Sequence, residues 1–149
     1  MTIAHRAIMA ILMIILRLSD PGEDKQRYSV RMFCQQALAY IDSNYRNNIK
    51  VQDIARALSV SHSHLTHVFN QEIHLSPFEY IGFLRISEAK QALLFSQQDA
   101  RHISKAVGYT RYNVFLNNFK LQTGLSPEEY RQKHHLTSYG DFGDHIEIV

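Results

Sequence analysis

Two stretches of the chain carry polar side chains whose spacing suits hydrogen bonding to the edges of DNA bases. In each stretch, large apolar residues recur three and four positions apart on one face of a helix, and polar residues fill the opposite face. Hydroxyl, imidazole, amide and guanidinium groups can pair with base edges in a major groove. The candidate residues of the first stretch are Ser61, His62, Ser63, Thr66, His67 and Asn70, and those of the second are Thr110, Arg111, Tyr112, Asn113, Leu116, Asn117 and Lys120.

The two stretches belong to an internal repeat. One copy spans residues 51–80 and the other about residues 100–130, with an offset of 49 residues up to a central turn and 50 after it. Each copy has a short helical pattern, a turn and a second helical pattern, which is the order of a helix-turn-helix unit. Two such units supply two helices that can each enter a major groove.

The helical periodicity, with no alternating strand pattern, predicts an all-α fold in which a long linker helix joins two helix-turn-helix units. The expected helices span residues 29–45, 51–58, 62–73, 77–95, 103–107 and 112–122, and a short last helix follows residue 126. Ser61 is the expected cap of the third helix, and Ser76 with Glu79 forms a capping box before the linker helix. At ~1.5 Å per residue that helix is roughly 28 Å long, near the ~34 Å between half-sites one turn apart. We therefore expect both second helices to face one side of a duplex.

The same periodicity predicts which side of each second helix is buried. The expected core residues are Leu65, Val68, Phe69 and Ile73 in the first unit, and Val114, Phe115 and Phe119 in the second. A polar face opposite such residues is, in a single helix, more typical of an ordinary solvated surface. The duplication of the arrangement favours DNA recognition.

The ends of the chain differ from the repeat. Residues 1–28 are expected to form an apolar helix over about residues 7–16 and a polar linker from residue 23. The apolar run is too short for a membrane span of about 20 residues, so no membrane association is expected. A helix that is apolar on all faces must be buried. The leading interpretation is a packing or homodimer helix left from an upstream domain, and packing on its own domain and a targeting segment are the alternatives. Residues 29–133 are the expected DNA-binding domain and residues 134–149 a flexible tail.

Composition excludes several classes of protein. The 149 residues have a net charge of only +2, and 45% are apolar, which is enough for a packed core. Cys34 is the only cysteine and lies on an apolar stripe, so it excludes an intrachain disulfide and a thiolate zinc cluster and favours a reducing cytoplasm. His64 and His67 have no carboxylate or thiolate at a suitable spacing, so no metal is expected. No phosphate-binding loop, carboxylate pair or Ser-His-Asp arrangement is present, and we expect neither an enzyme nor a cofactor.

A set of residues spread through both copies forms a familiar pattern: Asp53-Ile54-Ala55, Leu58-Ser59-Val60-Ser61-His62-Ser63-His64-Leu65, Phe69, Pro77, Tyr80, Arg85, Ala89, Leu93-Leu94, Ile103, Ala106-Val107-Gly108-Tyr109, Phe115, Phe119-Lys120, Gly124, Ser126-Pro127 and Tyr130-Arg131. This pattern, over about residues 30–133, resembles the DNA-binding region of the AraC/XylS family of bacterial transcription regulators. The resemblance implies sequence-specific promoter binding by both units, usually with activation through contact with RNA polymerase. Such regions often follow a ligand-sensing or dimerisation domain.

The chain departs from the family pattern at positions that matter for base reading. The family often has Arg where this chain has His67, and Ser-Arg where it has Leu116-Asn117. The second unit is therefore expected either to bind more weakly or to read thymine methyl groups through Leu116. Lys50 stands where a capping Ser or Thr is usual. These departures keep open an alternative function, an interaction module that has lost specific DNA binding and acts through partner regulators or polymerase.

Overall fold

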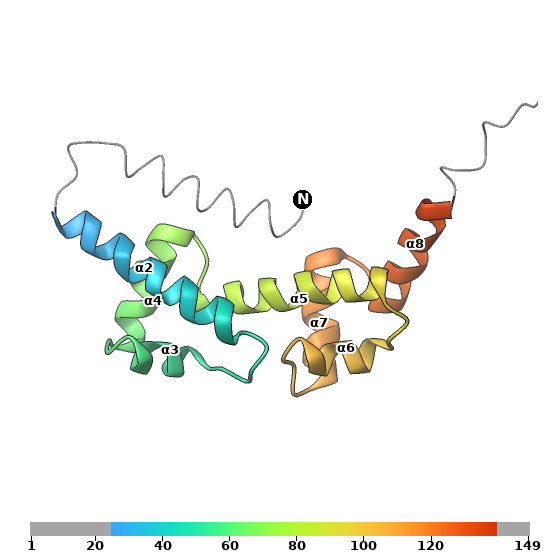
Figure 1. Ribbon diagram of the computed structural model, residues 1–149, viewed down its shortest axis with the longest axis horizontal. Coiled ribbons are helices and arrows are strands. Elements are labelled where there is room, and N and C mark those ends of the chain that lie inside the picture. The colour runs from blue at the N-terminus through green and yellow to red at the C-terminus, as the bar shows by residue number, and fades with distance from the viewer. Residues whose placement is uncertain (1–24, 140–149) are drawn as a thin grey trace, which may run out of the picture.

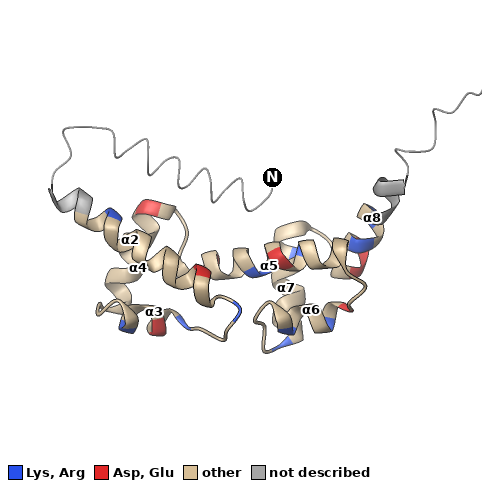
Figure 2. Cartoon of the chain, viewed as in Figure 1, with Lys and Arg blue, Asp and Glu red and all other residues tan. Residues whose placement is uncertain are grey.

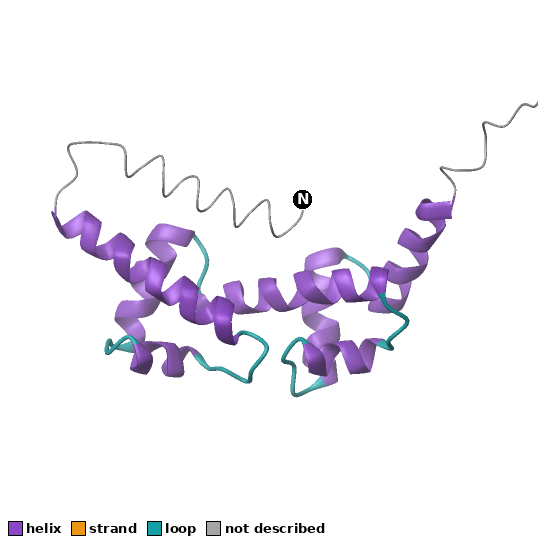
Figure 3. Cartoon of the chain, viewed as in Figure 1, coloured by secondary structure: helices purple, strands orange, loops and turns teal. Residues whose placement is uncertain are grey.

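The computed structural model describes residues 25–139, and within that range it consists of helices without a strand (Figure 3). The helices are α2 (Lys25–Asn44), α3 (Val51–Ala57), α4 (His62–Ile73), α5 (Pro77–Phe95), α6 (Ala100–Ala106), α7 (Tyr112–Thr123) and α8 (Pro127–Tyr139). The predicted all-α fold is confirmed. The expected apolar helix at residues 7–16 and residues 140–149 of the expected tail lie outside the described residues. None of the described helices is long and apolar enough to cross a membrane.

Capping residues explain why the predicted bounds of α4 and α5 are confirmed. The hydroxyl of Ser61 accepts a hydrogen bond from the backbone of His64 at 3.1 Å, which satisfies a free N–H at the start of α4. At the start of α5, Ser76 and Glu79 form a reciprocal capping box. The backbone bond from Ser76 lowers the pKa of Glu79 because it favours the ionised carboxylate.

Both ends of the described chain are more helical than the periodicity predicts. Helix α2 begins at Lys25, so residues 25–28 are helical and not part of a linker. Helix α8 continues to Tyr139 and has 13 residues, so it is not short, and residues 134–139 of the expected flexible tail belong to it. Helix α6 begins at residue 100, three residues before its predicted start, because Asp99 caps it through the backbone N–H of His102.

The helices enclose two separate hydrophobic cores, one in each helix-turn-helix unit (Figure 1). The first unit packs α2, α3, α4 and the beginning of α5 around buried residues that include Ile41, Ile54, Leu65 and Phe69. The second packs the rest of α5 with α6, α7 and α8 around Ile86, Leu93, Ile103, Phe115 and Phe119. Apolar burial of this kind is the main force that holds each unit together.

Helix α5 belongs to both cores and changes from one to the other at Arg85. Ile81 and Leu84 are buried in the first core, whereas Ile86 and Ala89 are buried in the second. A 19-residue helix that contributes to two cores connects them more stiffly than a loop would. The predicted linker helix is therefore confirmed, together with its place between the units.

Cys34 fulfils its expected role as a buried small apolar side chain in the first core. It is 4% exposed, and burial together with the nearby charge of Glu72 raises the pKa of its thiol to about 12. The thiol is protonated at neutral pH and therefore a poor nucleophile.

Candidate nucleic-acid interface

The second helices of the two units, α4 and α7, are held in equivalent ways. Phe69 on α4 meets the ring of Tyr80 edge-on at 5.6 Å, and Phe119 on α7 meets Tyr130 edge-on at 5.5 Å. Both phenylalanines are fully buried. Edge-on aromatic pairs add a directional preference to apolar burial, which fixes the rotation of each helix about its axis. Both helices begin at the edge of the molecule that lies away from α5 and rise toward it (Figure 1).

The turns that precede these helices also correspond. Ser59 and Gly108 adopt positive φ angles of 57° and 99°, and the next residues, Val60 and Tyr109, donate backbone hydrogen bonds to Ala55 and Ser104 at 2.9 Å. The same backbone turn therefore sets the angle between the two helices of each unit. The extra residue of the second copy lies after the turn, where Thr110 is exposed.

In the first unit, most of the predicted reading residues are exposed on α4: Ser61, His62, Ser63, His67 and Asn70. Thr66 is the exception. It is half-buried, and its hydroxyl oxygen is buried with no hydrogen-bond partner, so the predicted outward role of this hydroxyl is wrong. The reason is its place directly after Leu65, at the margin of the face that packs on the core.

In the second unit, the exposed predicted residues are Thr110, Arg111, Asn113, Asn117 and Lys120. Two other predictions for α7 are wrong. Leu116 is half-buried and packs against the second core, so it does not face outward. Val114 is 40% exposed and does not belong to the core. The buried face of α7 follows positions 112, 115, 116 and 119, which is helical spacing that leaves position 114 outside.

Tyr112 is a further correction, because it is half-buried and engaged within the second unit. Its ring stacks on Phe115 at 5.9 Å, and the guanidinium of Arg101 lies 4.5 Å from the ring centroid. Its hydroxyl is 3.4 Å from a carboxylate oxygen of Glu128 on α8. Tyr112 therefore joins α6, α7 and α8, and this contact network holds the start of α7.

Comparison with known proteins agrees with this geometry. Residues 54–133 match the family model described as "Helix-turn-helix domain". The lactose operon transcription activator of Staphylococcus xylosus is 34% identical over 103 residues, which are 69% of this chain and 36% of that protein. The C-terminal domain of AraT, a response regulator from Geobacillus stearothermophilus, superimposes with a TM-score of 0.68 at 26% identity over 76% of this chain and 94% of that one. An AraC-type DNA-binding regulator from Chromobacterium violaceum has a TM-score of 0.63 at 23% identity, covering 71% and 95% of the two chains.

The chain belongs to the AraC/XylS family. It spans about a third of the length of the curated relatives it matches. The matched relatives are named as transcription regulators. The family resemblance predicted from the residues is confirmed.

Helix α4 contains no Lys or Arg and one acidic residue, Glu72. Helix α7 contains Lys120 and follows Arg111. Figure 2 shows Lys and Arg positions on α3 and α6 and in the loops before α3 and α7. Among the described residues, the positive charge near α4 and α7, the candidate recognition helices, therefore lies mainly on the elements that flank them.

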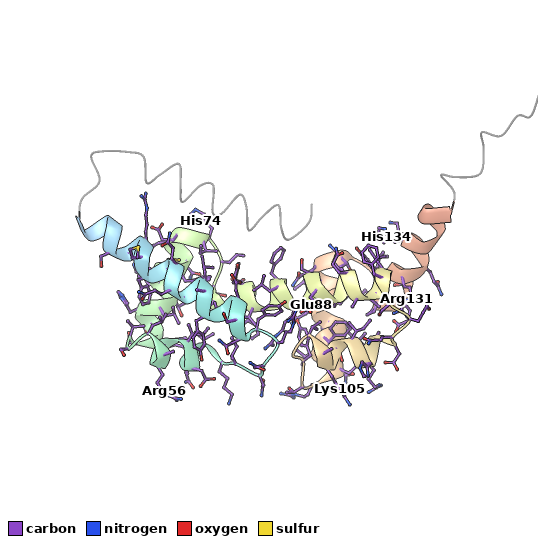
Figure 4. All side chains as sticks on the ribbon, in the orientation of Figure 1. Arg56, His74, Glu88, Lys105, Arg131 and His134 are labelled. Carbon is purple, nitrogen blue, oxygen red and sulfur yellow. The ribbon has the colours of Figure 1, made fainter. Side chains whose placement is uncertain are left out.

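Sequence reasoning missed two of these flanking cations, Arg56 on α3 and Lys105 on α6. They occupy equivalent positions in the two units, each in the last turn of the first helix, and both are exposed. Figure 4 shows them at the edge away from α5, where the recognition helices begin. Arg56 lies 3.5 Å from Asp53 in an exposed pair, which is too weak to hold it away from a phosphate. The repeat itself, with its offset of 49, was the signal that could have identified them.

The histidines of α4 do not converge with other ligands. His62, His64 and His67 are exposed, and the ring of His64 lies 5.5 Å from Phe33 of α2. Among the described residues, no group of three His, Cys, Asp or Glu side chains could hold a metal ion.

Proposed function

We propose that the protein is a sequence-specific transcription regulator that binds double-stranded promoter DNA through both recognition helices at once. The observation that carries the proposal is the placement of α4 and α7. The starts of α4 and α7 lie at one edge of the molecule (Figure 1). The two helices belong to units at opposite ends of the shared helix α5, and each of them carries exposed polar residues. A duplex presents successive major-groove segments on one side about 34 Å apart, and the 19-residue helix α5 that joins the two units is roughly 28 Å long.

The exposed residues divide into two roles. His67 and Asn70 of α4, with Asn113 and Asn117 of α7, carry groups that hydrogen-bond to base edges. A second group, Arg56, Lys105, Arg111 and Lys120, supplies cations for phosphates. Phosphate contacts fix the position of a protein on the duplex, and base contacts specify the sequence.

Three further parts of the expectation stay proposals. Activation is supported by the names of relatives that are transcription activators, and contact with RNA polymerase is the route that we propose for it. Homodimerisation through residues 1–28 concerns a segment outside the described residues. A cytoplasmic location follows from the need to reach promoter DNA.

Selection from a random duplex library, followed by binding to the selected sequence across a salt series, tests the function. We expect a bipartite motif with half-sites about one turn apart and an affinity that falls steeply with salt. Replacing Arg56 and Lys105 with Ala should leave the motif unchanged and reduce the slope of log K against log salt by roughly one for each phosphate that the variant no longer binds. Gln71→Ala, at an exposed uncharged position of α4, is the control and should leave motif and slope unchanged.

The same experiment distinguishes the alternatives. A single enriched half-site would show that only one unit reads bases. Selection of no motif, or binding that salt does not weaken, would contradict the proposal and favour the interaction module, whose binding to polymerase and to partner regulators should then be measured.

A further inference from the structure

The two units meet at a junction formed by the loop after α2, by α5 and by the turn of the second unit. The half-buried Arg85 of α5 lies where that helix passes from one core to the other. Its guanidinium donates to the backbone carbonyls of Tyr45 at 2.7 Å and Asn47 at 2.8 Å. Two hydrogen bonds from one planar group fix both the position and the orientation of the loop relative to α5.

The second unit touches the same loop through Gly108. A Cβ atom at this position would lie 2.7 Å from the carbonyl oxygen of Arg46 and 2.8 Å from that of Tyr45, so only glycine permits the contact. Gly108 also has a φ of +99°, and it belongs to the turn that sets the direction of α7. The loop of the first unit is thus in direct contact with the turn that aims the second recognition helix.

Two other contacts join the parts of this junction. The guanidinium of Arg85 lies 5.4 Å from the ring centroid of Tyr109, the residue after Gly108. Arg46 forms an ion pair with Glu88, one turn further along α5, with a shortest distance of 2.7 Å. Figure 4 places Glu88 near the middle of the molecule, between the two units. Arg46 is exposed and Glu88 is half-buried, and the ion pair is weak by comparison with the Arg85 contacts.

These contacts restrain a motion that α5 alone leaves open. A helix fixes the distance between two units, but small bends and twists along it change how the recognition helices are aimed. In B-DNA, adding one base pair between two half-sites rotates one relative to the other by roughly 34° and moves it about 3.4 Å. A junction that prevents rotation of this size determines which half-site separation both helices can reach.

We propose that Arg85 and Gly108 are positioning residues that set the half-site spacing, in base pairs, that the protein accepts. The proposal rests on the proposed DNA-binding function. It adds that the protein discriminates between DNA sites by the distance between their half-sites, and that this discrimination arises from residues that do not touch DNA bases. Arg85 acts by holding the loop after α2 against α5, and Gly108 by allowing the second unit to close on that loop.

The test is binding to duplexes that carry the two selected half-sites at separations from three base pairs shorter to three longer than the selected one. Wild-type protein should prefer one separation by on the order of tenfold over its neighbours, which corresponds to about 1.4 kcal/mol. Arg85→Lys keeps the charge but cannot make the same two-pronged contact. It should flatten the preference to roughly twofold while the affinity for each isolated half-site is retained.

Gly108→Ala has a matched control in Gly124→Ala. Both glycines have positive φ, so both substitutions introduce backbone strain, but a Cβ at Gly124 meets no atom within 4 Å. Gly108→Ala should flatten or shift the spacing preference, and Gly124→Ala should keep the wild-type profile. Thermal unfolding of each variant shows whether the fold is intact under the binding conditions.

A measurement without DNA separates this proposal from the proposed function. Spin labels at Gln71→Cys and Leu121→Cys, equivalent exposed positions on α4 and α7, report the distance between the recognition helices, while the native Cys34 is buried. The wild-type distance distribution should be narrow, and Arg85→Lys and Gly108→Ala should broaden it. Unchanged distributions together with an unchanged spacing profile would overturn the proposal. A different result would overturn DNA binding instead: wild-type protein binds no duplex, while its distance distribution is narrow and the variants broaden it. The junction would then still fix the two units relative to each other.

Discussion

The two helix-turn-helix units have the same backbone plan, but they stabilise their recognition helices at opposite ends. In the first unit, Ser61 caps the start of α4, and the residue after its end, His74, adopts a left-handed φ of 60° without being glycine. In the second, Arg111 precedes α7 and provides no side-chain cap, and the residue after its end is Gly124 in the same left-handed region. A non-glycine residue there costs roughly 1–2 kcal/mol, similar to the value of a cap.

The first helices of the units show the reverse distribution of caps. Helix α6 is capped by Asp99, whereas α3 begins at Lys50, whose ammonium group has donors only and cannot accept from the helix start. Asp53 reduces the loss by accepting from the backbone N–H of Lys50 at 2.9 Å. Each unit therefore has one well-capped helix and one poorly capped helix. In the second unit, the helix with the uncapped start is the recognition helix α7. The residue at its cap position, Arg111, is exposed and can contact DNA.

The largest expected effect comes from the two buried phenylalanines. Phe69→Ala and Phe119→Ala should each lower the free energy of unfolding by about 3–5 kcal/mol, because each leaves a cavity in a fully packed core. Because α5 belongs to both cores, we expect the two units to unfold in one shared transition, and each substitution should lower its midpoint. Circular dichroism during urea or thermal unfolding measures this midpoint.

A matched control and a contrary result are available for this pair. Phe95 is 82% exposed on α5, and Phe95→Ala should change stability by about 0.5 kcal/mol or less. Two resolved transitions, with only one displaced by each substitution, would show that the units unfold independently and that α5 does not couple them.

Sequence reasoning succeeded where the determining interactions are local. The bounds of α4 and α5 follow from Ser61, Ser76 and Glu79, whose bonds span three residues and are visible as short motifs. The start of α6 was predicted too late because Asp99 lies outside the apolar periodicity that was used to place the helix. Capping residues are thus better guides to helix ends than the apolar pattern is.

The exposure of the candidate residues was predicted correctly at most positions and wrongly at the margins of each helix face, whereas their contacts with DNA stay a prediction. Val114 and Leu116 are both apolar and lie on either side of Phe115, so composition cannot say which of them packs. Which of the two side chains is buried depends on where α5, α6 and α8 lie around α7, and this tertiary arrangement is not visible in the local sequence. The contact between Arg85 and Tyr45 spans 40 residues and uses a backbone carbonyl, so no side-chain pattern signals it.

A second, smaller effect is expected from the equivalent reading residues His67 and Asn117. His67→Ala should reduce base preference at one half-site only, and Asn117→Ala at the other, each by about 1–3 kcal/mol of discrimination. Asn117 should show the larger loss if it faces adenine, because an amide makes two bonds to that base and an imidazole makes one. Competition binding against single-base variants of the selected site measures both.

The same competition measurement tests whether both units read bases. Asn117→Arg, which introduces the residue common in the family, should move the preference of the second half-site toward guanine. If Asn117→Ala and Asn117→Arg leave every base preference as in wild type, α7 contributes phosphate contacts and position but reads no sequence. The first unit would then be the only reader.

The smallest expected effect concerns the starts of the recognition helices, and here stability and binding should change in opposite directions. Ser61→Ala should lower the free energy of unfolding by about 1 kcal/mol, because a helix N–H loses its acceptor. Arg111→Ser should raise it by up to about 1 kcal/mol, because Arg111 has an extended backbone suited to a cap, with φ −119° and ψ 121°, and its cation lies at the positive end of the helix. Urea unfolding measures both changes. The same Arg111→Ser variant should bind the second half-site more weakly and with a smaller dependence on salt, because one cation fewer pairs with the DNA phosphates. A variant that gains stability and keeps its affinity would show that Arg111 does not contact DNA, and the missing cap of α7 would then have no functional reason.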